Sequence, residues 1–92
     1  MRIALTARFV RDVDGLSDDR RLAVRAALRA LPDIVGRPHL HAGVGLRKIH
    51  PSGIWEARAG LGIRIVLAIE GDLATLVRAG THDRIRRYLK SL

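Results

Sequence analysis

The sequence is notable first for what it lacks. It contains no cysteine, which excludes disulfide bridges and thiolate metal ligands in this chain of 92 residues. Only three aromatic residues are present, so a base-stacking platform of the RRM or OB-fold kind is not expected. No apolar run approaches the roughly 18 residues needed to cross a bilayer, and the N-terminal stretch has no apolar core of a signal peptide. We therefore expect no membrane contact and a cytoplasmic location.

Acidic residues are scarce relative to basic ones. Nine acidic residues face seventeen basic ones, giving a formal net charge of +8 and a pI near 11.6. So large an excess on a small chain predicts a polyanionic partner, either nucleic acid or an acidic protein. Most of the basic residues are arginines, whose planar forks suit phosphate contacts better than lysine does. The apolar content of 48% is ordinary for a globular protein and indicates one domain over residues 1–92.

The N-terminal third of the chain predicts a strand and two helices. A polar–apolar alternation over residues 2–6 predicts a short strand, and Thr6 is a suitable N-cap for a brief helix that ends near Gly15. A second helix is expected from Ser17 to about Leu31, stopped by Pro32. Its apolar positions fall on one face, and its arginines are expected to form a solvated opposite face.

The rest of the chain predicts a sheet followed by a helix. A strand begins near Leu46, and residues 54–80 read as three strands separated by glycine turns, which is typical of an antiparallel meander. Thr81 is the expected cap of a terminal helix. Its expected buried side consists of Ile85, Tyr88, Leu89 and Leu92. The predicted fold is an α+β, two-layer domain: two N-terminal helices packed on a curled antiparallel β-sheet, plus a short C-terminal helix.

Two arginines interrupt strands that otherwise suit a core. Arg64 and Arg78 are either ion-paired or part of an open anion-binding face, because an unpaired buried charge is costly. For Arg64, a salt bridge to Glu56 or Glu70 is the structural alternative. A two-residue turn at Gly71-Asp72 would place Arg78 opposite Ile65 and on the face away from Arg64. A three-residue turn would place both arginines on one face.

No cofactor or metal site is predicted. His39 and His41 have the spacing of a ligand pair, but a third ligand at a suitable distance is missing. The glycines near Gly45 lack the full pattern of a phosphate-binding loop.

Four segments in fixed order carry a resemblance to a known family. They are Gly45-Leu46-Arg47-Lys48, Ile54-Trp55-Glu56-Ala57-Arg58, Ile63-Arg64-Ile65-Val66, and Arg78-Ala79-Gly80-Thr81-His82-Asp83 with Tyr88 six residues after His82. In order and spacing the chain resembles the RelE/ParE superfamily of bacterial toxin–antitoxin toxins. Two positions depart from the family pattern: Glu56 stands where some members have lysine, and Ile63 stands where they have an aromatic residue.

The resemblance implies which residues would act. RelE-like members are ribosome-dependent mRNA endonucleases, and their working residues are basic side chains on the sheet together with a C-terminal tyrosine. Carried over, these positions fall on Arg58, Arg64, His82 and Tyr88. We add Arg78 as a further cation and Glu56 as a candidate base. Residues expected to contact the RNA backbone are Arg47, Lys48 and Arg84.

These roles compete with structural ones. Guanidinium groups would neutralise the phosphorane, and His82 would protonate the leaving oxygen. Alternatively, His82 is a polar residue in a first helical turn, and Tyr88 belongs to the edge of the core.

The leading hypothesis is a type II toxin that cleaves mRNA on the ribosome and is neutralised by a cognate antitoxin. ParE-like inhibition of DNA gyrase without nuclease activity is the alternative, and an inactive member that only binds its antitoxin is a third.

Overall fold

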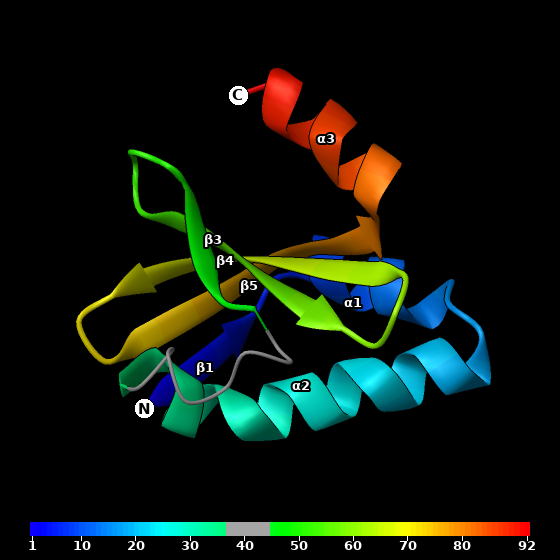
Figure 1. Ribbon diagram of the computed structural model, residues 1–92, viewed down its shortest axis with the longest axis horizontal. Coiled ribbons are helices and arrows are strands. Elements are labelled where there is room, and N and C mark those ends of the chain that lie inside the picture. Colours follow the sequence, from blue (N-terminus) through cyan, green and yellow to red (C-terminus); the bar gives the residue numbers. More distant parts are fainter. Residues whose placement is uncertain (37–44) are drawn as a thin grey trace.

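The computed structural model describes residues 1–36 and 45–92. The elements follow one another as β1 (Arg2–Leu5), α1 (Ala7–Asp14), α2 (Asp18–Gly36), β2 (Arg47–His50), β3 (Ile54–Ala59), β4 (Ile63–Glu70), β5 (Leu73–Thr81) and α3 (His82–Lys90). This order confirms the expected α+β class. Figure 1 shows α2 lying along one side of the sheet and α3 standing on the opposite side. None of the helices in the described ranges has the length and apolar composition to cross a bilayer.

The five strands form one sheet in the order β1-β5-β4-β3-β2. The three pairs β2–β3, β3–β4 and β4–β5 are antiparallel, as expected for a meander. The first strand differs, because β1 pairs parallel with β5, so the sheet is mixed. A parallel pair requires a long crossover, and α1, α2 and the remaining strands supply it between β1 and β5.

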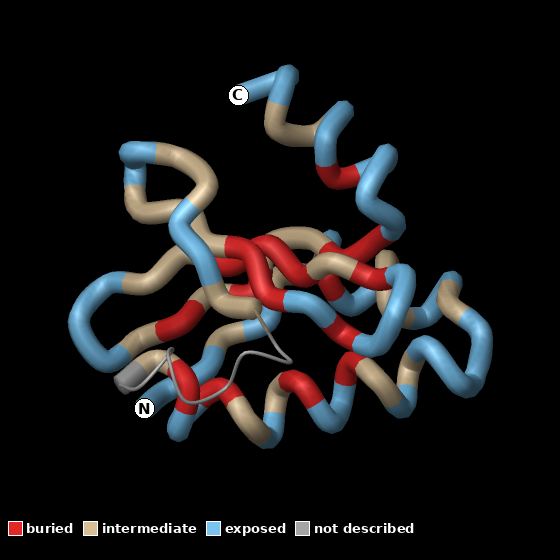
Figure 2. Tube along the Cα trace, in the orientation of Figure 1, coloured by how far each residue is buried: buried red, intermediate tan, exposed pale blue. Residues whose placement is uncertain are grey.

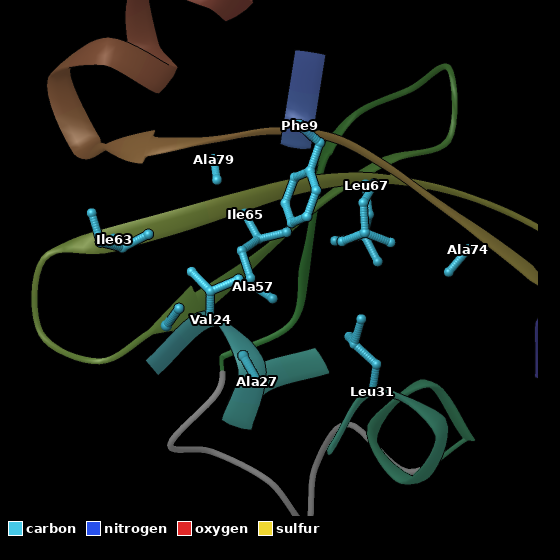
Figure 3. Packing of buried hydrophobic residues seen from close by; sticks show 12 residues of the cluster. Phe9, Val24, Ala27, Leu31, Ala57, Ile63, Ile65, Leu67, Ala74 and Ala79 are labelled. Atoms are coloured by element: carbon cyan, nitrogen blue, oxygen red, sulfur yellow. The ribbon is translucent and has the colours of Figure 1, made fainter. Parts of the chain in front are cut away.

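The main core lies between the sheet and the N-terminal helices. Phe9 of α1 and Val24 and Leu31 of α2 pack with alternate side chains of the central strands, among them Ile65 and Leu67 (Figure 3). These strand side chains point to one face because successive residues of a strand alternate. Figure 2 shows the resulting pattern, with buried residues concentrated on the central strands and on the inner side of α2.

Both predicted N-caps are present. Thr6 accepts a hydrogen bond from the backbone N–H of Phe9, and Thr81 accepts one from that of Arg84. Each satisfies a backbone donor that a helix leaves open at its first turn. Thr81 therefore fixes the point at which β5 ends and α3 begins. On α3, Ile85 is buried and Tyr88 and Leu89 are half-buried, whereas the prediction for Leu92 is wrong: it is 58% exposed and lies beyond the helix end.

The prediction that Pro32 ends the second helix is also wrong. Helix α2 continues to Gly36 with Pro32 inside it, on an exposed position. Proline removes one backbone hydrogen bond and crowds the preceding turn, which costs about 3 kcal/mol in a helix interior. The gain that offsets this cost is burial of apolar side chains on either side, since Leu31 and Ile34 are both fully buried.

The β4–β5 pairing settles the position of Arg78. The turn is the two-residue one, because Glu70 pairs with Leu73, but the register shifts by one residue between Val66 and Leu67. Arg78 therefore pairs with Val66, and not with Ile65 as a regular two-residue hairpin requires. Directly paired residues share a face of the sheet, so the bulge brings Arg78 to the side of Arg64.

Candidate functional site

The face of the sheet away from α2 carries a cluster of charged side chains. Ala57, Ala59 and Ile65 point into the core, so their neighbours Glu56, Arg58 and Arg64 point to the opposite, outer face. Arg58 and Arg64 occupy directly paired positions on β3 and β4. Like charges in such positions repel one another, so the fold accepts a cost in stability to hold two guanidiniums together.

Glu56 forms ion pairs with Arg64 and with a third arginine, Arg47. Its side chain is only 7% exposed, and its Oε1 lies 3.6 Å from Nε of Arg64 and 3.5 Å from Nη2 of Arg47. From the sequence, either Glu56 or Glu70 could form a salt bridge with Arg64. In the structure the partner of Arg64 is Glu56. The buried Glu56 carboxylate needs its arginine partners, because a buried charge without a partner is costly. The two ion pairs therefore hold the Arg47 and Arg64 guanidiniums beside Glu56.

These residues line a pocket of about 230 Å³, formed by Gly45, Arg47, Glu56, Arg58 and Arg64. We call it the outer-face pocket. Gly45 has a φ of +59°, and a Cβ atom at this residue would lie 2.5 Å from Nε of Arg58. The absence of a side chain therefore lets the Arg58 guanidinium lie against the backbone. With three arginines against one carboxylate among its described lining residues, the pocket is suited to an anion such as a phosphate group.

Arg78 and Tyr88 belong to a different group. Nε of Arg78 donates to Oδ2 of Asp12 at 2.7 Å, and the same oxygen accepts from the backbone N–H of Ala79 at 3.0 Å. The Arg78 guanidinium also lies over the Tyr88 ring, 5.3 Å from its centre, which is within cation–π range. This group joins α1, β5 and α3.

The structure thus divides the predicted site residues. Arg47, Glu56, Arg58 and Arg64 share the outer-face pocket, whereas Tyr88 and Arg78 line a neighbouring pocket with Arg84, Arg87 and Ser91. Lys48 is exposed on β2, next to Arg47. His82 is exposed at the first position of α3 and lines neither the outer-face pocket nor the pocket of Arg78 and Tyr88.

His82 nevertheless lies at the same end of the sheet as Arg64. Strand β5 ends at Thr81, which pairs with Ile63, and the preceding Gly80 pairs with Arg64. The first residue of α3 therefore follows directly on the strand beside Arg64. The other two histidines considered from the sequence, His39 and His41, lie outside the described residues.

Sequence reasoning missed two residues. Asp12 is separated from Arg78 by 66 positions, and a single aspartate on a short helix gives no sign of such a partner. The sequence gives Gly45 no role beyond the family resemblance, although a glycine just before a basic strand is compatible with a close approach of backbone and side chain. Both contacts depend on tertiary structure.

Comparison with known proteins identifies the fold. No protein-family model matches the chain, and no curated protein matches its sequence. Several solved structures match nearly its whole length. The RelE toxin in a RelB–RelE antitoxin–toxin complex from Methanococcus jannaschii superposes with a TM-score of 0.69 at 17% identity, covering 92% of this chain and 96% of that one.

Two further toxins superpose over a similar span. For YafQ from E. coli strain BL21(DE3) the TM-score is 0.62 at 20% identity, with 92% and 98% of the two chains covered. For a YoeB/ParE toxin from Agrobacterium tumefaciens it is 0.63 at 17% identity, with 89% and 99% covered. The expected resemblance is therefore confirmed at the level of structure, and the chain shares the fold of these solved structures.

Proposed function

We propose that this chain is the toxin of a type II toxin–antitoxin system and that it cleaves mRNA on the ribosome. The observation that supports this proposal best is the outer-face pocket, in which Arg47, Arg58 and Arg64 surround one buried carboxylate. A small anion site on the open face of a RelE-like sheet suits the phosphate of a single RNA strand. The ribosome would supply the positioning that a shallow pocket cannot, because orientation of the reacting atoms accounts for much of a barrier.

The reaction would proceed by transesterification. The 2′-hydroxyl of the message gives up its proton to a water molecule and attacks the adjacent phosphorus, the bond to the 5′-oxygen breaks, and the products are a 2′,3′-cyclic phosphate and a 5′-hydroxyl. Arg58 and Arg64 would stabilise the charge that develops on the phosphorane oxygens. His82 would donate the proton taken up by the leaving 5′-oxygen, acting as the general acid.

Glu56 is better suited to hold Arg47 and Arg64 than to accept the 2′-hydroxyl proton. Both arginines contact its Oε1, and the carboxylate is almost fully buried. Arg78 is likewise held by Asp12, and we assign it and Tyr88 to the placement of α3, the helix that begins with His82. Lys48 and Arg84 remain proposed contacts to the RNA backbone.

A cognate antitoxin is the proposed protein partner. Two of the similar structures are complexes of two proteins: RelB–RelE from Methanococcus jannaschii, described as an antitoxin–toxin complex, and DinJ–YafQ from E. coli. The net charge of +8 would favour an acidic antitoxin through electrostatic steering.

Inhibition of DNA gyrase is the second candidate function. The exposed position of His82, outside the arginine-lined pockets of the described residues, favours it, because a binding toxin requires no acid–base group. The similar structures include a chain described as a YoeB/ParE toxin.

Primer extension on cellular mRNA after brief induction separates these functions. Wild type would be compared with Arg64→Ala, His82→Ala and the control Arg25→Ala on the exposed side of α2. We expect new 5′ ends within translated regions for wild type and the control, and their loss in the other two variants. Growth arrest with intact messages would overturn the nuclease proposal and direct the test to gyrase-mediated DNA cleavage.

A further inference from the structure

A second, larger pocket lies where the end of β5 meets α1 and α3. Its volume is about 680 Å³, and its walls come from α1, the turn into α2, the first part of α2, the end of β5 and α3. We call it the arginine pocket because six guanidinium side chains line it. They are Arg8, Arg11, Arg20, Arg78, Arg84 and Arg87.

The charge in this pocket is far from balanced. Asp12 is the only acidic residue among the described residues that line it, and its side chain is 8% exposed. Its carboxylate is engaged by Arg78 at 2.7 Å and by the Ala79 N–H at 3.0 Å, while Nε of Arg8 lies 4.0 Å away. Arg11 and Arg20 are exposed and project from different helices, so they are available to a ligand from two sides.

The composition of the walls points to phosphate as the ligand chemistry. Among the described lining residues, only Leu16 and Ala79 have apolar side chains, whereas protein–protein interfaces have an apolar centre. None of these residues is aromatic, so they offer no aromatic ring on which a base could stack. Guanidinium forks converging from several elements match the oxygens of consecutive phosphates.

We propose that the arginine pocket binds the phosphate backbone of an RNA strand without reading its bases. This would be a second RNA contact, separate from the outer-face pocket. The two pockets are neighbours: Gly80 lines the arginine pocket and pairs directly with Arg64 on the adjacent strand, about 4.8 Å away. Use of both pockets by one message rests on the proposed function; binding of RNA to the arginine pocket does not.

Gly80 is in close contact with the Arg84 side chain of α3. A Cβ atom at this position would lie 3.1 Å from Cδ of Arg84, so the Arg84 side chain lies close over the glycine. Arg84 therefore lies over the residue that pairs with Arg64, where it would contact a strand that leads from one pocket to the other. The backbone contact expected for Arg84 from the sequence stays a prediction.

The test is equilibrium binding of a short, fluorescently labelled RNA whose 2′-hydroxyls are methylated, so that transesterification is blocked. Fluorescence anisotropy would compare wild type with the double variant Arg11→Ser/Arg20→Ser. The matched control is Arg25→Ser/Arg29→Ser, which removes the same charge from exposed positions of α2 outside the pocket. We expect the pocket variant to bind at least about tenfold more weakly. The slope of log K against log salt concentration should become less steep by about 1.4, because two phosphates would no longer be neutralised by a guanidinium.

The control variant should lose less than about threefold in affinity and keep the wild-type salt slope. Equal losses in the two double variants would overturn the proposal in favour of diffuse attraction by the net charge. Poly-glutamate that displaces RNA at similar charge concentration, with the same dependence on Arg11 and Arg20, would assign the pocket to an acidic protein segment. Because the probe cannot be cleaved, this binding test does not depend on whether the protein cleaves mRNA. Thermal unfolding verifies that each variant is folded.

Discussion

Asp12 and Arg78 form a part-buried ion pair that joins α1 to the last strand. The Nε–Oδ2 distance is 2.7 Å, and the two side chains are 8% and 13% exposed. The same carboxylate accepts the backbone N–H of Ala79, which lies beyond the part of β5 that pairs with β1. The Asp12 carboxylate thus pairs with the Arg78 guanidinium and also satisfies a backbone N–H of β5 that no neighbouring strand of the described residues pairs with on that side.

Replacing this aspartate should therefore be costly. We expect Asp12→Ala to lower the free energy of unfolding by about 3 kcal/mol, because Arg78 and the Ala79 N–H lose their partner in a buried environment. Asp14→Ala removes an exposed carboxylate from the same helix and should change it by no more than about 0.5 kcal/mol. Urea denaturation measures both, and similar small losses would show that the pair contributes little.

The Gly45 backbone offers a sharp comparison with Gly71. Both glycines have a φ near +60°, at +59° and +58°, but only at Gly45 would a Cβ meet Arg58, since nothing lies within 4 Å at Gly71. Each alanine substitution should cost about 1 kcal/mol for the left-handed backbone. Only Gly45→Ala should also reduce mRNA cleavage, by about tenfold or more, because it displaces the Arg58 guanidinium.

Cleavage rates on ribosome-bound message, measured beside urea denaturation, test this comparison. Two variants with equal stability and equal activity would contradict the placement of Arg58 in the working pocket.

Pro32 interrupts the hydrogen bonding of α2 at an exposed position. Pro32→Ala should restore the missing hydrogen bond and stabilise the chain by about 1–3 kcal/mol. The reverse change in the same helix, Ala26→Pro, should destabilise it by about 3 kcal/mol or more. Thermal unfolding compares them, and a lower melting temperature for Pro32→Ala would contradict a helix that continues through this residue.

The Arg78–Tyr88 contact makes a further prediction about α3. Tyr88→Phe keeps the ring face below the guanidinium and should leave the stability unchanged, whereas Tyr88→Leu should cost about 1 kcal/mol. Urea denaturation measures both changes. Loss of mRNA cleavage in a fully stable Tyr88→Phe variant would contradict the structural role assigned here and place the hydroxyl in the chemistry.

Local signals in the sequence were sufficient for most of the fold. Thr6 and Thr81 were recognised as caps, and Gly71-Asp72 as a turn, because each depends on residues within one helical turn or hairpin. The position of Arg78 could not be derived in the same way. It depends on a β-bulge in the pairing of β4 with β5, where the register shifts between Val66 and Leu67. No residue type in that stretch specifies a bulge.

Tertiary packing overrode local preference elsewhere. Pro32 favours a helix end, but burial of Leu31 and Ile34 outweighs it. The parallel pairing of β1 with β5 and the contact of Asp12 with Arg78 both join residues about 70 positions apart, which a single sequence does not reveal. Of the candidate site, the sequence identified the arginines of the outer face; it did not reveal that Arg78 and Tyr88 form a separate group.

The most direct measurement is single-turnover cleavage of a ribosome-bound message in which one nucleotide, at a mapped cleavage position, carries 2′-deoxyribose. Attack by the 2′-hydroxyl is the chemistry that we propose for the outer-face pocket, so the deoxy message should remain intact while the unmodified message yields a 2′,3′-cyclic phosphate and a 5′-hydroxyl. Arg64→Ala should slow cleavage of the unmodified message by about 100-fold or more. Equal cleavage of both messages, or none of either beside inhibition of gyrase, would contradict the account.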